Sequence, residues 1–301
     1  MIDRRRFMQC LAWAGTGLVW SAHAGRLSSA TLAEAAPAGS DFTFAQISDT
    51  HVGFAGDANR NAAGTLADSI AALNALPTPP AFVIHTGDLT HGQKAGAFDT
   101  LAETLKAVRT ERIVYVPGEH DVFLDGGKEY LARYGRGTLG GGWQSFDYRG
   151  VHFVGLVNVL TYKAGVGGAL GADQLGWLEK DLAPLGTSTP VVVFTHVPLW
   201  AVYPAWGWTT ADGEEAIGML RRFGSVTVLN GHIHQVLQKI EGNLTFHSAR
   251  STAFPQPAPG AAPSPGPMKV EAEQLRRLLG VREVRYTEGA APLALVERPL
   301  A

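Results

Sequence analysis

Residues 113–121 read Ile-Val-Tyr-Val-Pro-Gly-Glu-His-Asp, and this stretch decides how the rest of the chain is interpreted. β-Branched and aromatic residues fill its first half, which is typical of a buried strand. A Pro-Gly pair then ends the strand in a sharp turn. The next three residues, Glu119, His120 and Asp121, are ligands, acids or bases. The strand therefore delivers reactive side chains to one edge of a sheet, as α/β enzymes do.

Bulk composition limits the classes of function. The chain has 301 residues, of which 46% are hydrophobic and 17% are charged, as in a globular protein with a sizeable core. Its formal net charge of −2 provides no basic surface, so we expect no nucleic-acid partner. The one cysteine, Cys10, can form neither an intrachain disulfide nor a thiolate zinc site. Any metal site must therefore use histidines and carboxylates.

The first 24 residues have the pattern of a signal peptide. Arginines at positions 4–6 precede an apolar run over residues 10–22, and Ala-His-Ala at 22–24 is a small-x-small cleavage pattern. The order Arg-Arg-x-Phe-Met resembles the twin-arginine signature, which implies that the twin-arginine machinery exports the folded protein, to the periplasm or otherwise out of the cytoplasm. An amphipathic helix or a retained anchor is the alternative. The apolar run is too short and too rich in Gly and Ala for a membrane-spanning helix, so we expect no stable membrane insertion of the mature protein.

Residues 25–40 read as a linker, and residues 41–301 as a single α/β domain. Strands predicted at 42–48, 81–86 and 112–116 alternate with helices at 58–76 and 95–108, which favours a parallel sheet with crossover helices. A hairpin-like pair at 144–148 and 151–157 favours a second sheet rich in antiparallel pairs. Further strands are predicted at 190–195, 225–230, 236–240, 244–247 and 292–297, and helices at 173–182, 211–223 and 271–279. The Pro-rich segment 251–267 is predicted to be an extended loop near the site.

Five predicted strand ends carry ligand-type residues. A single histidine is more often structural than a ligand, but five such motifs at the same end of their strands favour one shared site. Side chains alternate along an extended chain, so Asp-x-His and His-x-His each place two ligands on one side. Two ions ~3.5–4 Å apart require a bridging carboxylate, and oxygen and imidazole ligands suit iron, manganese or zinc. The motifs are Asp49-x-His51, Gly87-Asp88, Gly118-Glu119-His120-Asp121, His196 and Gly231-His232-x-His234.

This order of motifs resembles the calcineurin-like metallophosphoesterase superfamily, and the resemblance extends over residues 42–246. It implies a four-layer α/β/β/α sandwich with two mixed β-sheets and a dinuclear metal centre at the C-terminal ends of the strands. It further implies that each ion has its own ligands and that Asp88 bridges the two ions. The implied ligands are Asp49, His51 and His234 for the first ion, and His196 and His232 for the second.

The resemblance also implies a reaction. A metal-bound hydroxide would attack the phosphorus of a small-molecule phosphate ester, with no nucleophilic side chain. His120 would protonate the leaving group or stabilise the phosphoryl oxygens, and Asp121 would orient its imidazole.

Glu119 departs from the family pattern, which usually has Asn at this position. One interpretation is that Glu119 still binds the second metal ion and, by its charge, disfavours a dianionic monoester relative to a monoanionic diester. The other is that Glu119 distorts the second position and leaves a non-catalytic metal-binding or scaffold protein. Carboxylates are competent ligands for such metals, so we favour ligation and a phosphodiester substrate.

Other residues are candidates for substrate contact. His91 follows the Gly-Asp motif and could contact phosphate or have an ordinary packing role. Trp200 and Trp206 belong to the run Trp-Ala-Val-Tyr-Pro-Ala-Trp-Gly-Trp, which could stack a nucleobase, line an apolar pocket or simply cap the core. Arg250 could reach phosphate from the start of the Pro-rich loop. We expect His152, in a predicted strand, to be structural.

Overall fold

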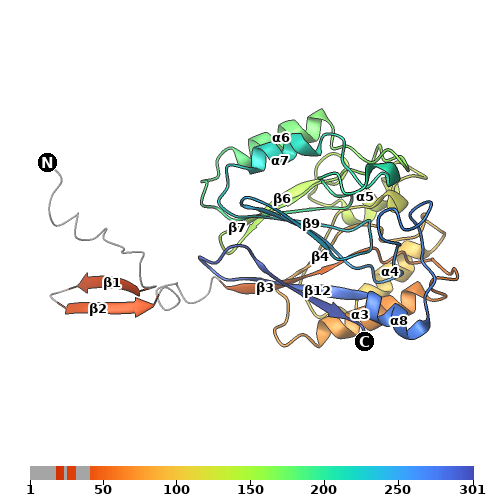
Figure 1. Cartoon of the computed structure of the whole chain (residues 1–301), viewed down its shortest axis with the longest axis horizontal. Coiled ribbons are helices and arrows are strands. Elements are labelled where there is room, and N and C mark those ends of the chain that lie inside the picture. Colours follow the sequence, from red (N-terminus) through yellow and green to blue (C-terminus); the bar gives the residue numbers. More distant parts are fainter. Residues whose placement is uncertain (1–17, 24–25, 32–40) are drawn as a thin grey trace.

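A computed structural model describes residues 18–23, 26–31 and 41–301 (Figure 1). The first two ranges form a two-stranded antiparallel sheet of β1 (Leu18–His23) and β2 (Arg26–Thr31). The sequence predicts the end of a signal peptide and the start of a linker there, and the strand pair is an additional feature. The rest of the predicted signal peptide and linker, including the paired arginines, lies outside the described residues.

The first large sheet carries three of the motif-bearing strands. Its order is β13-β12-β3-β4-β5. Strands β3, β4 and β5 are parallel, as the alternating strands and helices predict, whereas β12 runs antiparallel to both β3 and β13. The sheet is therefore mixed. The strand bounds are β3 (Phe42–Ile47), β4 (Val83–His85), β5 (Ile113–Tyr115), β12 (Gly280–Tyr286) and β13 (Ala294–Pro299).

The second large sheet has the order β10-β11-β9-β8-β7-β6. Its four inner strands are parallel, and only the edge pairs β6–β7 and β10–β11 are antiparallel, so the prediction of an antiparallel-rich sheet is wrong. The hairpin turn is a local sequence signal, but the parallel pairs depend on crossovers that local patterns do not reveal. The bounds are β6 (Gln144–Tyr148), β7 (Val151–Gly155), β8 (Val191–Thr195), β9 (Val226–Asn230), β10 (Leu237–Glu241) and β11 (Leu244–Ser248).

Helices cover the outer faces of both sheets and complete the four predicted layers (Figure 1). Helices α6 and α7 lie on the second sheet, and α3, α4 and α8 lie on the side of the first. Among the described residues, no helix has the length and apolar character that a membrane crossing requires. The bounds are α3 (Ala62–Asn74), α4 (Ala97–Leu105), α5 (Lys128–Tyr134), α6 (Ala172–Leu182), α7 (Gly213–Leu220) and α8 (Ala272–Leu278), with 3₁₀ turns η1 (Glu119–Asp121) and η2 (Pro204–Trp206).

Aromatic residues fill the interface between the two sheets. Phe44 and Phe82 of the first sheet stack with ring centroids 5.3 Å apart, and Phe153 of the second meets both edge-on. Complete burial of one such ring stabilises the fold by about 2–3 kcal/mol. The two sheets are thus fixed against each other, and their strand ends form a rigid frame for the site.

Strand β12 is the main element that the sequence patterns did not predict. It reads Gly-Val-Arg-Glu-Val-Arg-Tyr, and its charged residues obscure the strand signal. Arg282 is nevertheless 1% exposed and Glu283 fully buried. Arg282 pairs with Glu297 of β13, and Glu283 pairs with Arg298. Buried charges are tolerated when they are paired in this way.

Candidate metal centre

All five predicted motifs meet at one edge of the two sheets. Each begins one to four residues beyond the C-terminal end of a strand, which is where parallel strands present side chains to a common crevice. The motif residues follow β3 (Asp49, His51), β4 (Asp88), β5 (Glu119, His120, Asp121), β8 (His196) and β9 (His232, His234).

The backbone of these residues is strained. Five of the ligand-type residues have a positive φ, between 40° and 69°, although none is glycine. This left-handed conformation costs of order 1–3 kcal/mol per residue and is typical of functional sites, where the surrounding structure must hold it. The strain turns the side chains inward from the strand ends. The five residues are Asp49, His51, Asp88, His232 and His234.

Two glycines allow the motif loops to approach one another. A Cβ on Gly118 would lie 2.1 Å from Asp88 Oδ1, and one on Gly231 would lie 2.1 Å from Ser48 Oγ. Either contact would displace a loop that carries a ligand-type residue. Glycine at these two positions therefore brings the ligand-type residues of different loops close together.

Asp49, His51 and His234 form the first triad, which is sealed. Asp49 Oδ1 lies 3.1 Å from His234 Nε2, and the Nε2 atoms of the two histidines are 3.3 Å apart. His234 Nδ1 donates to the Phe254 carbonyl at 2.6 Å, so its Nε2 is left as the ligand atom. The Phe254 ring stacks on His51 at 4.7 Å. The Pro-rich loop therefore packs directly over this triad.

Glu119, His196 and His232 form the second triad. The Glu119 carboxylate lies 2.9 Å from His196 Nε2 and 3.1 Å from His232 Nδ1. His196 Nδ1 donates to the Thr86 carbonyl at 2.7 Å, which again leaves Nε2 as the ligand atom. Tyr162 Oη lies 3.3 Å from His232 Nε2. The Glu119 side chain is 16% exposed, so this triad, unlike the first, is open on one side.

Asp88 lies between the two triads. Its Oδ2 is 3.4 Å from His51 Nε2 and 3.5 Å from His196 Nε2. Its Oδ1 accepts a hydrogen bond from the His120 amide at 3.0 Å, which fixes the orientation of the carboxylate. One carboxylate oxygen thus faces both groups, as a bridging ligand must.

The residues of both triads fit two metal ions. In each triad the three ligand atoms lie within 4.8 Å of one another, and Asp88 groups in the same way with Asp49 and His196. Glu119 Oε2 is buried 2.9 Å from His196 Nε2, which donates a hydrogen bond to it only when His196 is protonated, and a cation bound between the two atoms would take the place of that proton. Burial raises the pKa of Glu119, but the nearby His232 and His196 outweigh it and hold that pKa well below its usual value. Carboxylates and imidazoles in this combination suit manganese, iron or zinc.

His120 and His91 lie together at the centre. Their rings stack with centroids 4.7 Å apart, and His91 Nδ1 lies 3.2 Å from His51 Nδ1. Burial, and then the neighbouring His120, lower the pKa of His91 to about 4, so this ring is neutral. His120 Nδ1 is buried and has no hydrogen-bond partner. His91 thus supports both His51 and His120, and the structure brings it into the site.

Asp121 has a different position from the one expected. Its carboxylate accepts hydrogen bonds from the amides of Gly118, Leu89 and Thr90 at 2.8–2.9 Å, and within the described residues none joins it to the His120 ring. Burial and the charge of Asp88 raise the pKa of Asp121 to about 7. Asp121 therefore ties the loop after β5 to the loop after β4, and the prediction that it orients the imidazole is wrong.

Three predicted substrate residues lie elsewhere. Trp200 is buried against Phe246 in the core under α6 and α7, and Trp206 is buried against Trp208. These tryptophans cap the core, which was the alternative interpretation of the aromatic run. Arg250 donates to backbone carbonyls at the end of α8 and not towards the triads. The prediction that these three residues bind substrate is therefore corrected.

A cleft of about 570 Å³ opens beside the second triad, and the sequence patterns did not predict it. Glu119 and His120 form its inner wall. Phe123 and Leu160 are 63% and 46% exposed on its outer part. Val122 and Phe123, the apolar residues that directly follow the Glu-His-Asp motif, are a sequence signal that could have indicated this cleft. The lining residues are Glu119, His120, Val122, Phe123, Gly126, Val159, Leu160, Tyr162 and Ala164.

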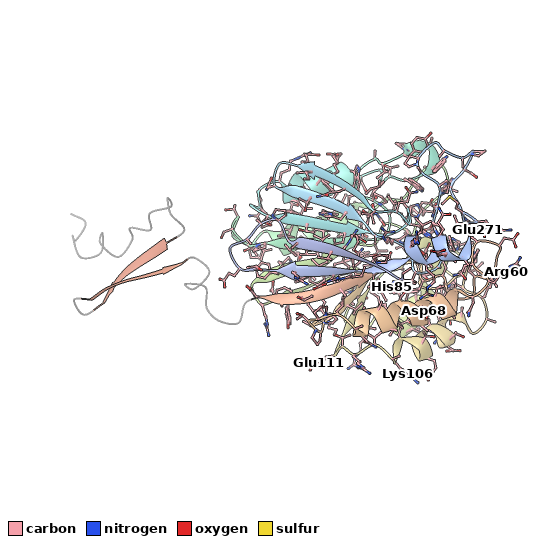
Figure 2. The ribbon with its side chains drawn as sticks, turned by 60° about the horizontal axis from the view of Figure 1, so that its bottom comes forward. Arg60, Asp68, His85, Lys106, Glu111 and Glu271 are labelled. Atoms are coloured by element: carbon pink, nitrogen blue, oxygen red, sulfur yellow. The ribbon has the colours of Figure 1, made fainter. Side chains whose placement is uncertain are left out.

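His85, the last residue of β4, supports the loop that follows this strand. In Figure 2 it lies within the body of the molecule, whereas the labelled Lys106 lies at the outer edge. Burial lowers the pKa of His85 to about 3, so the ring is neutral. Its Nδ1 accepts from the Gly87 amide at 3.2 Å, and its Nε2 lies 3.1 Å from Thr50 Oγ1. His85 thus joins two of the motif loops.

Comparisons with known proteins agree with this geometry. The profile of the family described as calcineurin-like phosphoesterase matches residues 42–236. A 3′,5′-cyclic-nucleotide phosphodiesterase of Nostoc sp. is 24% identical over 219 residues, which cover 70% of this chain and 79% of that protein. A probable cyclic nucleotide phosphodiesterase of Rhodopseudomonas palustris is 27% identical over 223 residues, 70% of this chain and 78% of that protein.

A solved structure shows the same fold. A dimetal phosphatase from Danio rerio superposes with a TM-score of 0.62 at 15% identity, over 86% of this chain and 96% of that one. The matched family range contains Asp88 and every residue of the two triads. The chain belongs to the calcineurin-like phosphoesterase family and is a metal-dependent phosphoric ester hydrolase.

Proposed function

We propose that this protein hydrolyses phosphodiesters whose organic group occupies the cleft beside His120. The observation that carries the proposal is the position of Asp88 between two ligand triads, one of which opens into that cleft. When bound, two metal ions supply an activated water and a positive clamp for the phosphoryl oxygens. The residues that would hold them are the two triads and Asp88.

His120 serves the leaving group in this proposal. One of its ring nitrogens lies within 4.8 Å of carboxylate oxygens of Asp88 and Glu119, and the ring also lines the cleft. Burial lowers the pKa of His120, but Asp88, Glu119 and Asp121 outweigh it, so the pKa lies above its ordinary value. From this position the imidazole of His120 can deliver a proton to the site where the leaving oxygen develops charge.

The charge of the site favours a diester. Three carboxylates, those of Asp49, Asp88 and Glu119, converge on the centre. Of the described residues that line the cleft, none is lysine or arginine. A dianionic monoester meets more repulsion there than a monoanionic diester. The two curated relatives are named as cyclic-nucleotide phosphodiesterases, and a cyclic nucleotide is itself a monoanionic diester with an uncharged organic group.

A substrate panel tests this function. Purified protein loaded with Mn²⁺ is given bis(p-nitrophenyl) phosphate, p-nitrophenyl phosphate and a 3′,5′-cyclic nucleotide. We expect kcat/KM for the diesters to exceed that for the monoester by at least about tenfold, which corresponds to ~1.4 kcal/mol. A preference for the monoester contradicts the diester assignment, and no turnover of any ester contradicts catalysis itself.

A second candidate function is a metal-binding or scaffold protein with impaired turnover. It is favoured by the contacts of Glu119, whose Oε2 lies 2.9 Å from His196 Nε2 and whose Oε1 lies 3.1 Å from His232 Nδ1. Such an arrangement can satisfy the histidines without a second ion. Metal analysis separates the two functions, because two ions per chain with turnover support the enzyme, whereas one ion or none without turnover supports the scaffold.

We also propose that the protein is exported through the twin-arginine machinery. The supporting observation is the Arg-Arg-x-Phe-Met order at positions 4–8, ahead of the apolar run. Replacement of Arg4 and Arg5 by lysine should retain the protein in the cytoplasm, as measured by immunoblotting of periplasmic and cytoplasmic fractions. Periplasmic recovery of the double variant at the wild-type level contradicts this route.

A further inference from the structure

Arg282 of β12 is a buried charge that no step of the proposed reaction uses. Its side chain is 1% exposed. It donates from Nη1 to Gln46 Oε1 at 2.9 Å, from Nη2 to the Ser248 carbonyl at 2.6 Å, and from Nε to Glu297 Oε1 at 2.5 Å. Arg282 therefore joins three strands, and one of its partners, Gln46, lies on the strand that leads to Asp49.

A chain of buried hydrogen bonds continues from Gln46 to the metal centre. Gln46 Nε2 donates to Thr86 Oγ1 at 3.0 Å, Thr86 Oγ1 donates to Ser48 Oγ at 2.7 Å, and Ser48 Oγ donates to Asp49 Oδ2 at 2.5 Å. Each group accepts one bond and donates the next. All donors thus point the same way, from the Arg282 guanidinium to the Asp49 carboxylate.

We propose that Arg282 is a positioning residue that sets the direction of this chain and thereby orients Asp49 for metal binding. A guanidinium has five donors and no acceptor, so Gln46 must turn its carbonyl oxygen towards Arg282 and its NH₂ group towards Thr86. The hydroxyls of Thr86 and Ser48 then have only one consistent arrangement. In a buried environment, such aligned hydrogen bonds strengthen one another.

Asp49 depends on this last hydrogen bond. The Ser48 hydroxyl holds Oδ2, while Oδ1 lies 3.1 Å from His234 Nε2 in the first triad. If Ser48 turned its proton away, Oδ2 would lose its side-chain donor and would keep only the His232 amide, which both oxygens share. The carboxylate could then rotate out of the first triad. Thr86 extends the effect, since its carbonyl holds His196 of the second triad.

A purely structural role for Arg282 is the competing explanation, because the residue also binds Glu297 and Ser248. Two variants separate the roles. Arg282→Met removes the charge that directs the chain. Gln46→Glu keeps an acceptor for Arg282 but cannot donate to Thr86, so it interrupts the chain while the arginine remains paired.

Arg298 provides a matched control in strands β12 and β13. Arg298 of β13 donates to the buried Glu283 of β12 at 2.7 Å, and Glu283 is also held by Arg285 at 2.6 Å. None of these three residues belongs to the hydrogen-bond chain that ends at Asp49. Arg298→Met therefore removes a half-buried arginine that pairs with the buried Glu283, and it changes no residue of the metal centre.

The experiment is a calorimetric titration of metal-free protein with Mn²⁺, together with thermal melting of each metal-free variant. Loss of a supporting contact to a ligand typically weakens metal affinity by about 10–100-fold. We expect a weakening of about tenfold for Arg282→Met and for Gln46→Glu, and less than about twofold for Arg298→Met. Melting temperatures report the structural part of each change separately.

Wild-type Mn²⁺ affinity in Gln46→Glu overturns the proposal, as does an Arg282→Met variant that melts earlier yet binds Mn²⁺ normally. If Arg282→Met does not fold, Gln46→Glu decides alone. Equal weakening in Arg298→Met would show a general effect of strand stability and would also overturn it. The readout is metal binding, so failure of the proposed hydrolytic function appears separately, as normal Mn²⁺ binding without turnover.

Discussion

The histidines of the metal centre and His152 on β7 have similar contacts but opposite roles. His234 Nε2 lies 3.1 Å from a carboxylate oxygen of Asp49, and His152 lies 2.8 and 2.9 Å from Asp147 and Asp181. In His234, however, a backbone carbonyl takes Nδ1, and Nε2 faces several other ligand atoms. In His152 both ring nitrogens bind carboxylates, so neither is left for a metal ion.

This difference shows what distinguishes a ligand histidine from a structural one. Proximity to a carboxylate does not, because both kinds have it. A ligand histidine has one nitrogen fixed by the protein and the other directed to a shared point, as His196 and His234 do. The metal centre also stores backbone strain in positive φ angles, whereas His152 lies in a regular strand.

The largest effect is expected from Asp88→Asn, which breaks the centre that the two triads share. A bridging carboxylate contributes several kcal/mol of charge stabilisation through the ions it holds. Its loss should lower kcat/KM by roughly 10³-fold. Metal analysis of the purified variant should show less than two ions per chain.

Asp181→Asn is the matched control for that prediction, since it makes the same change beside His152. Its kcat/KM should stay within about twofold of wild type, because the hydrogen bonds of Asp181 within the described part of the chain are with the structural histidine and Ser145. If Asp88→Asn keeps its full metal content and activity, Asp88 is not a bridging ligand.

The sequence was sufficient to locate the metal centre because its signals are local. Asp49, Asp88 and Glu119 each follow a short strand pattern, and the ends of parallel strands meet at one edge. Gly118 and Gly231 belong to the motifs, but the atoms that they approach, Asp88 Oδ1 and Ser48 Oγ, lie on other loops. The four-layer sandwich followed from the family resemblance.

Features that depend on distant contacts were not predictable. β12 carries Arg282 and Glu283, whose charges argue against a buried strand until their partners on β13 and β3 are known. Trp200 was misplaced because an aromatic run beside a motif looks the same whether it faces substrate or core. Asp121 was misassigned because two of the amides that it binds, those of Leu89 and Thr90, come from another loop.

The second-largest effect is expected from His120→Asn, which removes a ring that neither triad uses. General acid catalysis contributes about 10²–10⁴-fold, and we expect a loss of about 10²-fold in kcat for a cyclic nucleotide. The loss should be smaller for bis(p-nitrophenyl) phosphate, whose leaving group needs little protonation. Metal content should stay at the wild-type value. An equal loss for both substrates argues against proton donation.

Glu119→Asn tests whether the charge in the open second triad sets the preference for diesters. It removes one negative charge at the mouth of the cleft while His196 and His232 remain. We expect the ratio of monoester to diester kcat/KM to rise about tenfold, equivalent to ~1.4 kcal/mol of relieved repulsion. An unchanged ratio would show that Glu119 does not set substrate charge. A large gain on both substrates would instead support the second candidate function, in which Glu119 impairs turnover.

The smallest effect on activity is expected from His152→Gln, which should change only stability. Burial lowers the pKa of His152, but its bonds to Asp181 and Asp147 outweigh burial and raise that pKa above 6.5. The protonated pair therefore stabilises the fold fully below the unfolded pKa, and this contribution is lost as pH rises through the raised pKa. Burial raises the pKa of Asp181, but its hydrogen bonds to His152 and Ser145 outweigh burial and lower that pKa. The stabilisation that Asp181 contributes is therefore present above pH 3.8 and is lost as the pH falls through the lowered pKa.

Between pH 3.8 and pH 6.5, the charge-assisted hydrogen bond between His152 and Asp181 contributes about 2 kcal/mol to the free energy of unfolding. The melting temperature of His152→Gln should therefore lie roughly 5 °C below wild type near pH 5.5. The gap should shrink as the pH rises through the raised pKa of His152, because the ring then loses its charge in the folded state as well, while kcat/KM stays within about twofold throughout. Differential scanning fluorimetry across this pH range measures the gap. If the gap does not change with pH, His152 stabilises the fold by packing and not by a charged pair. If the variant loses activity, His152 is not a purely structural histidine.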